Sequence, residues 1–146
     1  MKKLDITKVR PLIKIALTED LGAGDVTSEL LFSQEDRAQA HIVAREKIIA
    51  SGMDVVQAVL AHYDKKLSLD VHFDDGEWVP CNGRLATVEG PRITMLSAER
   101  VVLNFLQRLC AIATTTNGYV QAVQDTGALI YDTPTTIPGW RVLGKY

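Results

Sequence analysis

Three polar side chains recur along one side of a predicted helix in the middle of the chain. Arg100, Asn104 and Gln107 stand at i, i+4 and i+7, a spacing that places them on one face of an α-helix. A guanidinium fork suits a planar oxyanion such as a carboxylate, and the amides beside it could bond the rest of a polar ligand. The solvated face of a surface helix has the same pattern, so spacing alone leaves both interpretations open.

A second group of polar side chains, rich in threonine, lies near the C-terminus. Thr133, Thr135 and Thr136 fall in a predicted loop, residues 132–139, directly after a short apolar segment. In barrels of alternating strands and helices, the loops after the strands build the active site. These hydroxyls could therefore hold phosphate or carboxylate oxygens. Two prolines remove N–H donors from the same loop, and a stiff connector explains its composition equally well.

Other suggestive residues have structural explanations. Asp74 and Asp75 precede a glycine, which predicts a hairpin turn rather than an acidic pair for a metal-bound diphosphate. The acidic, glycine-containing stretch 19–27 predicts a surface turn in which Asp25 or Thr27 caps the next element. No phosphate-loop, nucleophile-elbow or zinc-protease motif occurs in the sequence. The histidines are scattered and are predicted to be structural: His41, His62 and His72.

The apolar periodicity predicts an α+β fold. The order of elements indicates an N-terminal α/β sandwich, residues 1–112, followed by the beginning of an incomplete α/β (TIM-like) barrel, residues 113–146. The strand at 67–73 is expected to form a hairpin with 77–79. A bend is expected at Asn117-Gly118. Helices are predicted over 6–21 (with Thr7 as N-cap), 53–63, 97–116 and 119–124, and strands over 38–44, 48–50, 67–73, 77–79, 84–89 and 128–131.

The helix at 97–116 carries the clearest helical period in the chain. Glu99 falls inside its predicted apolar stripe, where a carboxylate is costly unless a buried partner pairs with it. The stripe consists of Val102, Leu103, Leu106, Leu109, Cys110 and Ala113.

Composition narrows the class of protein. The apolar content of 47% and the charged content of 23% are ordinary for a globular domain. A net charge of −2 does not favour nucleic acid or a membrane surface as partner, and no apolar run reaches the roughly 20 residues of a membrane span. Cys81 and Cys110 have no zinc-ligand spacing and fit free thiols in a reducing cytoplasm, the expected location.

Three stretches of the sequence together resemble the quinolinate phosphoribosyltransferase family, also called carboxylating nicotinate-nucleotide pyrophosphorylase. The first is Ala16–Thr27, with its acidic and glycine residues. The second is Ala98–Leu109 followed by Ile112-Ala113-Thr114. The third runs from Ile130-Tyr131-Asp132-Thr133 through Pro138-Gly139 and Arg141 to Lys145-Tyr146.

The resemblance implies a fold, a reaction and partners. Members have an N-terminal α/β sandwich and an incomplete α/β barrel. They convert quinolinate and phosphoribosyl pyrophosphate with Mg²⁺ into nicotinate mononucleotide, CO2 and pyrophosphate. They are dimers or multiples of dimers, in which the sandwich of one subunit supplies an arginine to the partner's barrel. That arginine matches Arg100, whereas the Mg²⁺ ligands match nothing in this chain and no residue is assigned as catalytic.

Two departures from the family pattern bear on function. After Asp-Thr the family places Arg-Lys-Thr, where this chain has Pro134-Thr135-Thr136. Loss of two charge-assisted contacts to a dianion would cost roughly 1.5–3 kcal/mol each. Cys110-Ala111 stands where the family usually has Ser-Gly, which places a methyl group where close packing is expected.

Two functions follow from these features. The chain is either the N-terminal portion of a quinolinate phosphoribosyltransferase, expected to be inactive alone, or a non-catalytic, degenerate paralogue that serves as a dimerising or ligand-binding module. Pro134-Thr135 favours the second hypothesis, and the match through Arg100 favours the first.

Overall fold

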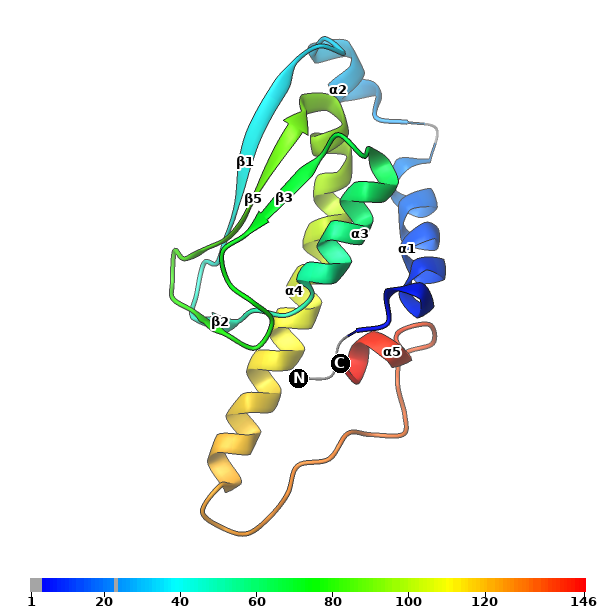
Figure 1. Cartoon of the computed structure of the whole chain (residues 1–146). Coiled ribbons are helices and arrows are strands. Elements are labelled where there is room, and N and C mark those ends of the chain that lie inside the picture. The colour runs from blue at the N-terminus through cyan, green and yellow to red at the C-terminus, as the bar shows by residue number, and fades with distance from the viewer. Residues whose placement is uncertain (1–3, 23) are drawn as a thin grey trace.

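The computed structural model of the protein describes residues 4–22 and 24–146 (Figure 1). The helices are α1 (Ile6–Leu21), α2 (Val26–Leu31), α3 (Met53–Tyr63), α4 (Arg92–Val123) and α5 (Arg141–Gly144). The strands are β1 (Arg37–Val43), β2 (Ile48–Ile49), β3 (Ser68–Val71), β4 (Trp78–Val79) and β5 (Arg84–Pro91). This mixture of helices and small antiparallel sheets confirms the predicted α+β class.

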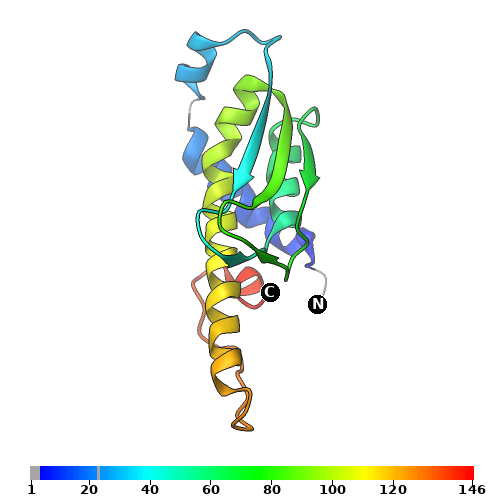
Figure 2. The same cartoon turned by 90° about the vertical axis from the view of Figure 1, so that its left-hand side faces the viewer.

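Two antiparallel sheets lie beside the helices. The larger sheet has the order β1-β5-β3, and the smaller pairs β2 with β4. Helices α3 and α4 cover one face of the larger sheet, and α1 packs on the outer side of these helices (Figures 1 and 2). The central strand β5 is buried from Leu85 to Val88, because it has a neighbouring strand on each side and helices across one face.

The core forms where α3 and α4 cross the sheet. Val55, Val56 and Val59 of α3 are fully buried, at the helical spacing expected of an inward face. Gly52, at the start of α3, has φ +105°, and a Cβ there would lie 2.5 Å from Leu109 Cδ1 of α4. Only glycine allows α3 and α4 to approach so closely at this point.

Two predictions about single residues in the helices are wrong. The N-cap of α1 is Asp5, whose carboxylate accepts a hydrogen bond from the backbone N–H of Thr7, so Thr7 is already inside the helix. Glu99 is exposed, because the buried face of α4 is centred on Ala98 and Val101 rather than on Leu103. A carboxylate in water needs no buried partner.

The predicted hairpin of 67–73 with 77–79 does not form either. β3 pairs with β5, and β4 pairs with β2, so the two segments belong to different sheets. The Asp74-Asp75 turn redirects the chain between sheets because the Asp75 carboxylate accepts from the backbone N–H groups of Gly52 and Met53. Asp75 thereby caps the N-terminus of α3 across 22 and 23 residues of sequence.

Helix α4 is longer than predicted. It begins at Arg92 and runs for 32 residues, through Asn117 and Gly118, where a bend was predicted. Asn and Gly lower helix propensity by at most about 1 kcal/mol each, far less than the roughly 3 kcal/mol of a proline, so neither residue is enough to end the helix. Within α4, the Thr114 hydroxyl accepts from the backbone N–H of Ile49, which joins the helix to β2.

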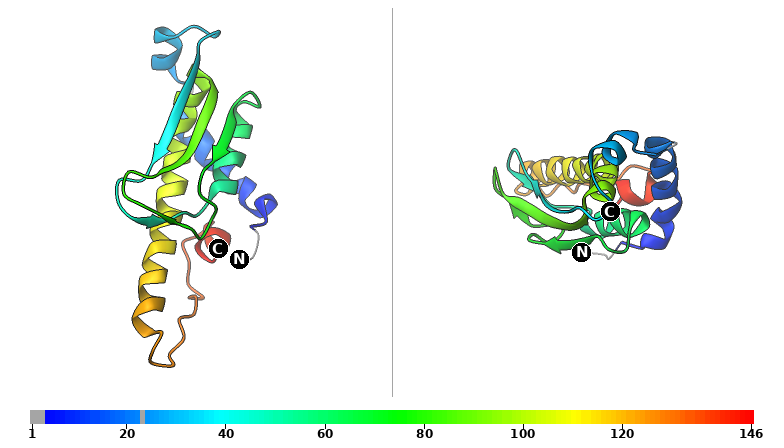
Figure 3. Two further views of the ribbon diagram at one scale, coloured as in Figure 1. Left: turned by 60° about the vertical axis from the view of Figure 1, so that its left-hand side comes forward. Right: turned by 90° about the horizontal axis from the view of Figure 1, so that it is seen from above.

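The C-terminal segment returns along the molecule. Residues 128–131 pair with no strand in the described part of the chain, so the predicted strand is absent there. The chain then runs back from the far end of α4 to α5, which lies near α1 (Figure 3). Trp140 stacks on Phe105 of α4, with ring centroids 5.2 Å apart, and Leu143 is buried.

The division into residues 1–112 and 113–146 stays a prediction, because α4 continues across it without a break. Among residues 4–22 and 24–146, no helix has both the length and the apolar character needed to cross a membrane.

A continuous α4 predicts that Gly118→Ala stabilises the protein by about 0.5–1 kcal/mol, because alanine has the higher helix propensity. Nothing lies within 4 Å of the position that its Cβ would occupy. Urea denaturation would measure the change, with Gly52→Ala as a destabilised control. Loss of stability in Gly118→Ala would contradict a helix that continues through this residue.

Candidate functional site

Arg100 projects from α4 into solvent beside the end of α1. Its Nη1 lies 3.2 Å from Asp20 Oδ1; the arginine side chain is 76% exposed and the aspartate side chain only 19%. Asn104, Gln107 and Ala111 are also exposed, so the polar face predicted from the sequence lies in solvent. Among residues 4–22 and 24–146, Asp20 is the one hydrogen-bond partner of the guanidinium, which is otherwise open to solvent.

The turn of α4 before Arg100 is held by contacts from two other elements. The Ser97 hydroxyl lies 3.0 Å from Asp25 Oδ2 and 3.0 Å from the backbone oxygen of Ile93, so it has two acceptors. The Tyr63 hydroxyl, at the end of α3, donates to the backbone oxygen of Ser97 at 2.8 Å. These bonds fix the position of α4 one turn before the arginine.

The electrostatics of this cluster favour a charged aspartate and a neutral tyrosine. Hydrogen bonds from Ser28 hold the pKa of the Asp25 carboxyl below its usual value, and Ser97 adds to the effect. Burial, together with the nearby charges of Asp20 and Asp25, raises the pKa of Tyr63 to about 12. Tyr63 therefore keeps the proton that it donates to Ser97.

The acidic, glycine-containing stretch does more than the surface turn that its spacing predicts. Asp25 is the N-cap of α2, accepting from Ser28 N at 3.0 Å, which confirms the predicted cap. The contacts of Asp25 with Ser97 and of Asp20 with Arg100 span 72 and 80 residues of sequence. No local pattern could indicate them, and Asp20 was missed as a site residue.

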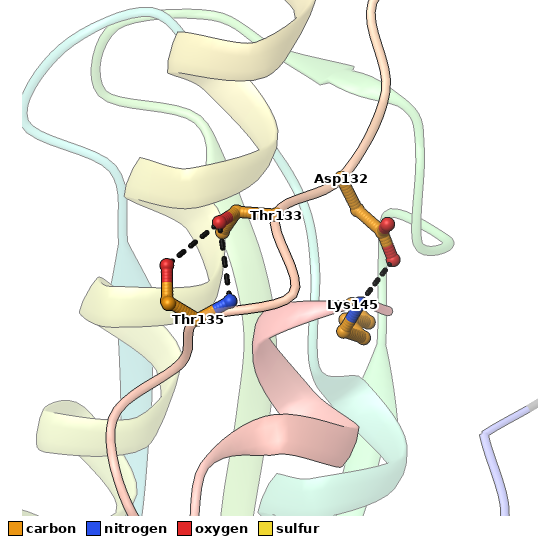
Figure 4. Close-up of polar contacts among 4 residues, drawn as sticks. All are labelled: Asp132, Thr133, Thr135 and Lys145. Atoms are coloured by element: carbon orange, nitrogen blue, oxygen red, sulfur yellow. Dashed lines mark hydrogen bonds and ion pairs between the residues drawn. The ribbon is translucent and has the colours of Figure 1, made fainter.

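The threonine-rich loop, residues 132–139, is folded on itself (Figure 4). The hydroxyls of Thr133 and Thr135 lie 2.8 Å apart, and the backbone N–H of Thr135 donates to the Thr133 hydroxyl at 3.2 Å. Asp132 forms an ion pair with Lys145 of 2.7 Å, and Thr136 is half-buried. The loop thus presents hydroxyls near the surface, but its one carboxylate is already paired.

The two predicted groups of site residues are not brought together. Arg100 contacts the C-terminal end of α1, whereas residues 132–136 lie near α5, toward the opposite end of the molecule (Figure 1). A ligand bound by both groups would need them from different chains.

His41, His72 and Asp75 have structural partners. His41 Nδ1 and His72 Nε2 lie 3.2 Å and 2.8 Å from the Thr87 hydroxyl, so the three side chains form a line across β1, β5 and the end of β3. Asp75 Oδ2 also accepts from the Tyr146 hydroxyl at 2.8 Å, which ties the C-terminal residue to the cap of α3.

A groove of about 1160 Å³ lies between β1 and α4. Ile42, Val102 and Leu106 contribute to an apolar floor, and Glu99 and Gln107 are among the polar residues around it. Ala111 also lines this groove and is exposed, so the methyl group that departs from the family pattern faces the groove.

Comparison with known proteins defines the class of fold. A solved structure of the nicotinate-nucleotide pyrophosphorylase from Francisella tularensis matches with a TM-score of 0.92 at 33% identity, covering 99% of this chain and 51% of that chain. The family model of the quinolinate phosphoribosyl transferase N-terminal domain matches residues 25–110. The fold is therefore that of the N-terminal domain of a phosphoribosyltransferase.

Curated protein sequences match the chain as well. The chain is 35% identical over 139 residues to a probable nicotinate-nucleotide pyrophosphorylase (carboxylating) of Bacillus subtilis, covering 95% of this chain and 48% of the relative. It is 34% identical over 139 residues to the mitochondrial quinolinate phosphoribosyltransferase (decarboxylating) 2b of Nicotiana tabacum, covering 94% of this chain and 39% of the relative. The chain belongs to the quinolinate phosphoribosyltransferase family and spans about half or less of the length of these relatives.

The contacts of Asp25 predict that Asp25→Ala destabilises the protein by about 1–2 kcal/mol at pH 7, because a helix cap and a bond to Ser97 are both lost. The folded-state pKa lies below the ordinary 3.8, so this stabilisation is complete above that value. It is lost as the pH falls through the folded-state pKa. Urea unfolding at several pH values would show the difference between wild type and variant shrinking in acid; a constant difference would contradict this account.

Proposed function

We propose that this chain acts as the N-terminal part of a quinolinate phosphoribosyltransferase, in the synthesis of NAD precursors. The reaction joins quinolinate to phosphoribosyl pyrophosphate and releases nicotinate mononucleotide, CO2 and pyrophosphate. Membership of the family supports the proposal. The observation that carries it is the exposed guanidinium of Arg100 on a helix turn held by Asp25 and Tyr63.

Arg100 suits the substrate chemically. Quinolinate has two adjacent ring carboxylates, and a guanidinium binds a carboxylate through two parallel N–H bonds. Nη1 is directed to Asp20, and no group among the described residues is hydrogen-bonded to Nε–H or Nη2, which can donate to a carboxylate. The proposed role of Arg100 is to bind and orient quinolinate and to balance its negative charge.

We propose that Arg100 acts at the site of a second subunit in a homodimer. The separation of Arg100 from residues 132–136 within one chain supports this arrangement, because a single chain does not assemble both groups. Exposed apolar side chains also support it: Leu129 is 71% exposed and Tyr131 is 79% exposed. Side chains of this size favour burial against another surface.

The proposed role of Thr133, Thr135 and Thr136 is to bind oxygens of the substrates, with Thr135 standing where the family has a lysine. Their hydroxyls are weaker partners for a dianion than Arg and Lys. For Mg²⁺, residues 4–22 and 24–146 hold no group of three or more His, Cys, Asp or Glu side chains placed to bind a metal, and Asp132 is paired with Lys145. The described residues thus do not fit the ion, and the proposal assigns it no ligand among them.

The non-catalytic paralogue stays as the second candidate function because of Pro134-Thr135. Phosphoribosyl pyrophosphate as a binding partner is part of the proposed reaction and belongs to the first function only. The cytoplasmic location stays a prediction, since several relatives are named as mitochondrial and one as chloroplastic.

A grafted enzyme tests the proposal, with the second half of the Francisella relative placed after Tyr146. One version keeps Pro134-Thr135, and a second carries Pro134→Arg/Thr135→Lys. Adding Arg100→Ala to the second version is expected to lower kcat/KM for quinolinate by about 10- to 100-fold, since a charge-assisted contact is worth about 1.5–3 kcal/mol. The 146-residue chain alone is expected to form no product.

Mixing two deficient versions tests whether Arg100 acts across the dimer. One partner has Arg100 but Pro134-Thr135; the other has Arg-Lys at these positions but Arg100→Ala. Co-refolded mixtures should have about a quarter of the activity of the grafted enzyme that carries Pro134→Arg/Thr135→Lys and an intact Arg100. Half of the dimers then contain both partners, and each of these has one complete site out of two. Activity no higher than that of the separate proteins would contradict action across the dimer. Inactivity of the Pro134→Arg/Thr135→Lys version with Arg100 intact would favour the non-catalytic function.

A further inference from the structure

Arg100 is a long and exposed side chain, and in the part of the chain that the structure describes it forms an ion pair with Asp20 alone. An unrestrained arginine on a helix surface samples many rotamers, and binding a ligand then costs the entropy of fixing it. In this structure Nη1 is directed to Asp20 at 3.2 Å, a distance at which an N–H donates to a carboxylate. The contact restrains the far end of the side chain, where the binding groups are.

Asp20 is itself held in place. It lies in the last turn of α1, and its side chain is mostly buried, 19% exposed. That helix is anchored by the buried Ile13 and Leu17, and the backbone N–H of Gly22 donates to the Thr18 oxygen to close its C-terminus. The carboxylate therefore stands on an anchored helix, and it contacts the far end of an otherwise exposed arginine side chain.

We propose that Asp20 is a positioning residue for Arg100: it holds one edge of the guanidinium, so that the opposite edge is oriented for a ligand carboxylate. The proposal rests on the ligand-binding role proposed above for Arg100. An ion pair this exposed adds little to the free energy of unfolding. Its consequence is the orientation of the fork, which a planar, two-point contact with a carboxylate requires.

The same geometry allows an opposite outcome. Asp20 is an anion close to a site proposed for a dianion, and it could compete with quinolinate for the arginine. Water screens the repulsion between two carboxylates on opposite edges of an exposed guanidinium. Orientation of Arg100 is therefore expected to outweigh repulsion of the ligand. If so, removing the charge of Asp20 lowers the affinity for quinolinate, whereas dominant repulsion would make the same change raise it.

Nuclear magnetic resonance of the 146-residue chain, labelled with ¹⁵N in arginine, tests the contact without any assumption about the reaction. The Arg100 Nε–H order parameter should be high in wild type and fall in Asp20→Asn to the level of an exposed arginine such as Arg10. Asp20→Glu, which keeps the carboxylate, should restore part of the order. Glu19→Gln is the matched control, because it removes an exposed charge next to Asp20 and should leave Arg100 unchanged.

Steady-state kinetics of the grafted enzyme with Pro134→Arg/Thr135→Lys provides the functional measurement. Asp20→Asn should raise KM for quinolinate about 3- to 10-fold with kcat changed less than twofold, and Glu19→Gln should change neither. Equal order of Arg100 in wild type and Asp20→Asn, or an unchanged or lower KM, would overturn the positioning role. Loss of order in Asp20→Asn combined with full activity in Arg100→Ala would instead refute the function proposed for Arg100.

Discussion

The rest of this structure depends on which face of α4 is buried in the core. The helix buries Ala98, Val101 and Phe105 against α3 and the sheet, and burial of such side chains is the largest favourable term in folding. Once that face is inside, Arg100 and Asn104 must face solvent, because 3.6 residues per turn leave them no other direction.

Contacts from other elements then fix this part of the molecule at two levels. Near its start, Asp25 and Tyr63 hold Ser97, so that the turn carrying Arg100 joins α3 and the loop before α2. Farther along, Trp140 stacks on Phe105, while Tyr146 donates to Asp75, which also caps α3. The C-terminal segment is thus tied to the body that positions the arginine, although the threonine-rich loop within that segment lies far from it.

The sequence predicts the elements whose signals are local. The helices at 6–21 and 53–63 are confirmed with the predicted bounds, because their apolar periodicity and flanking glycines act over a few residues. The hairpin was wrong because the partner of each strand is chosen by the whole sheet. The strand at 128–131 was expected from composition, but a strand needs a neighbour, and none in the described part of the chain lies beside it.

At the candidate site, too, local features were predicted from the sequence and contacts between distant residues were not. Helical spacing was enough to place Arg100, Asn104 and Gln107 on an exposed face, which the structure confirms. The partners that hold this face, Asp20 and Asp25, come from a segment more than 70 residues earlier, so their role appears only in the folded chain. Roles of Arg100, Thr133, Thr135 and Thr136 in binding substrates stay predictions.

A double-mutant cycle between Asp25 and Ser97 tests most directly whether the acidic loop holds the helix turn that carries Arg100. The free energy of unfolding would be measured for Asp25→Ala, Ser97→Ala and the double variant. The account predicts a coupling of about 0.5–1.5 kcal/mol, the usual contribution of a hydrogen bond. Additive effects, within about 0.3 kcal/mol, would mean that the two side chains do not interact and would contradict it.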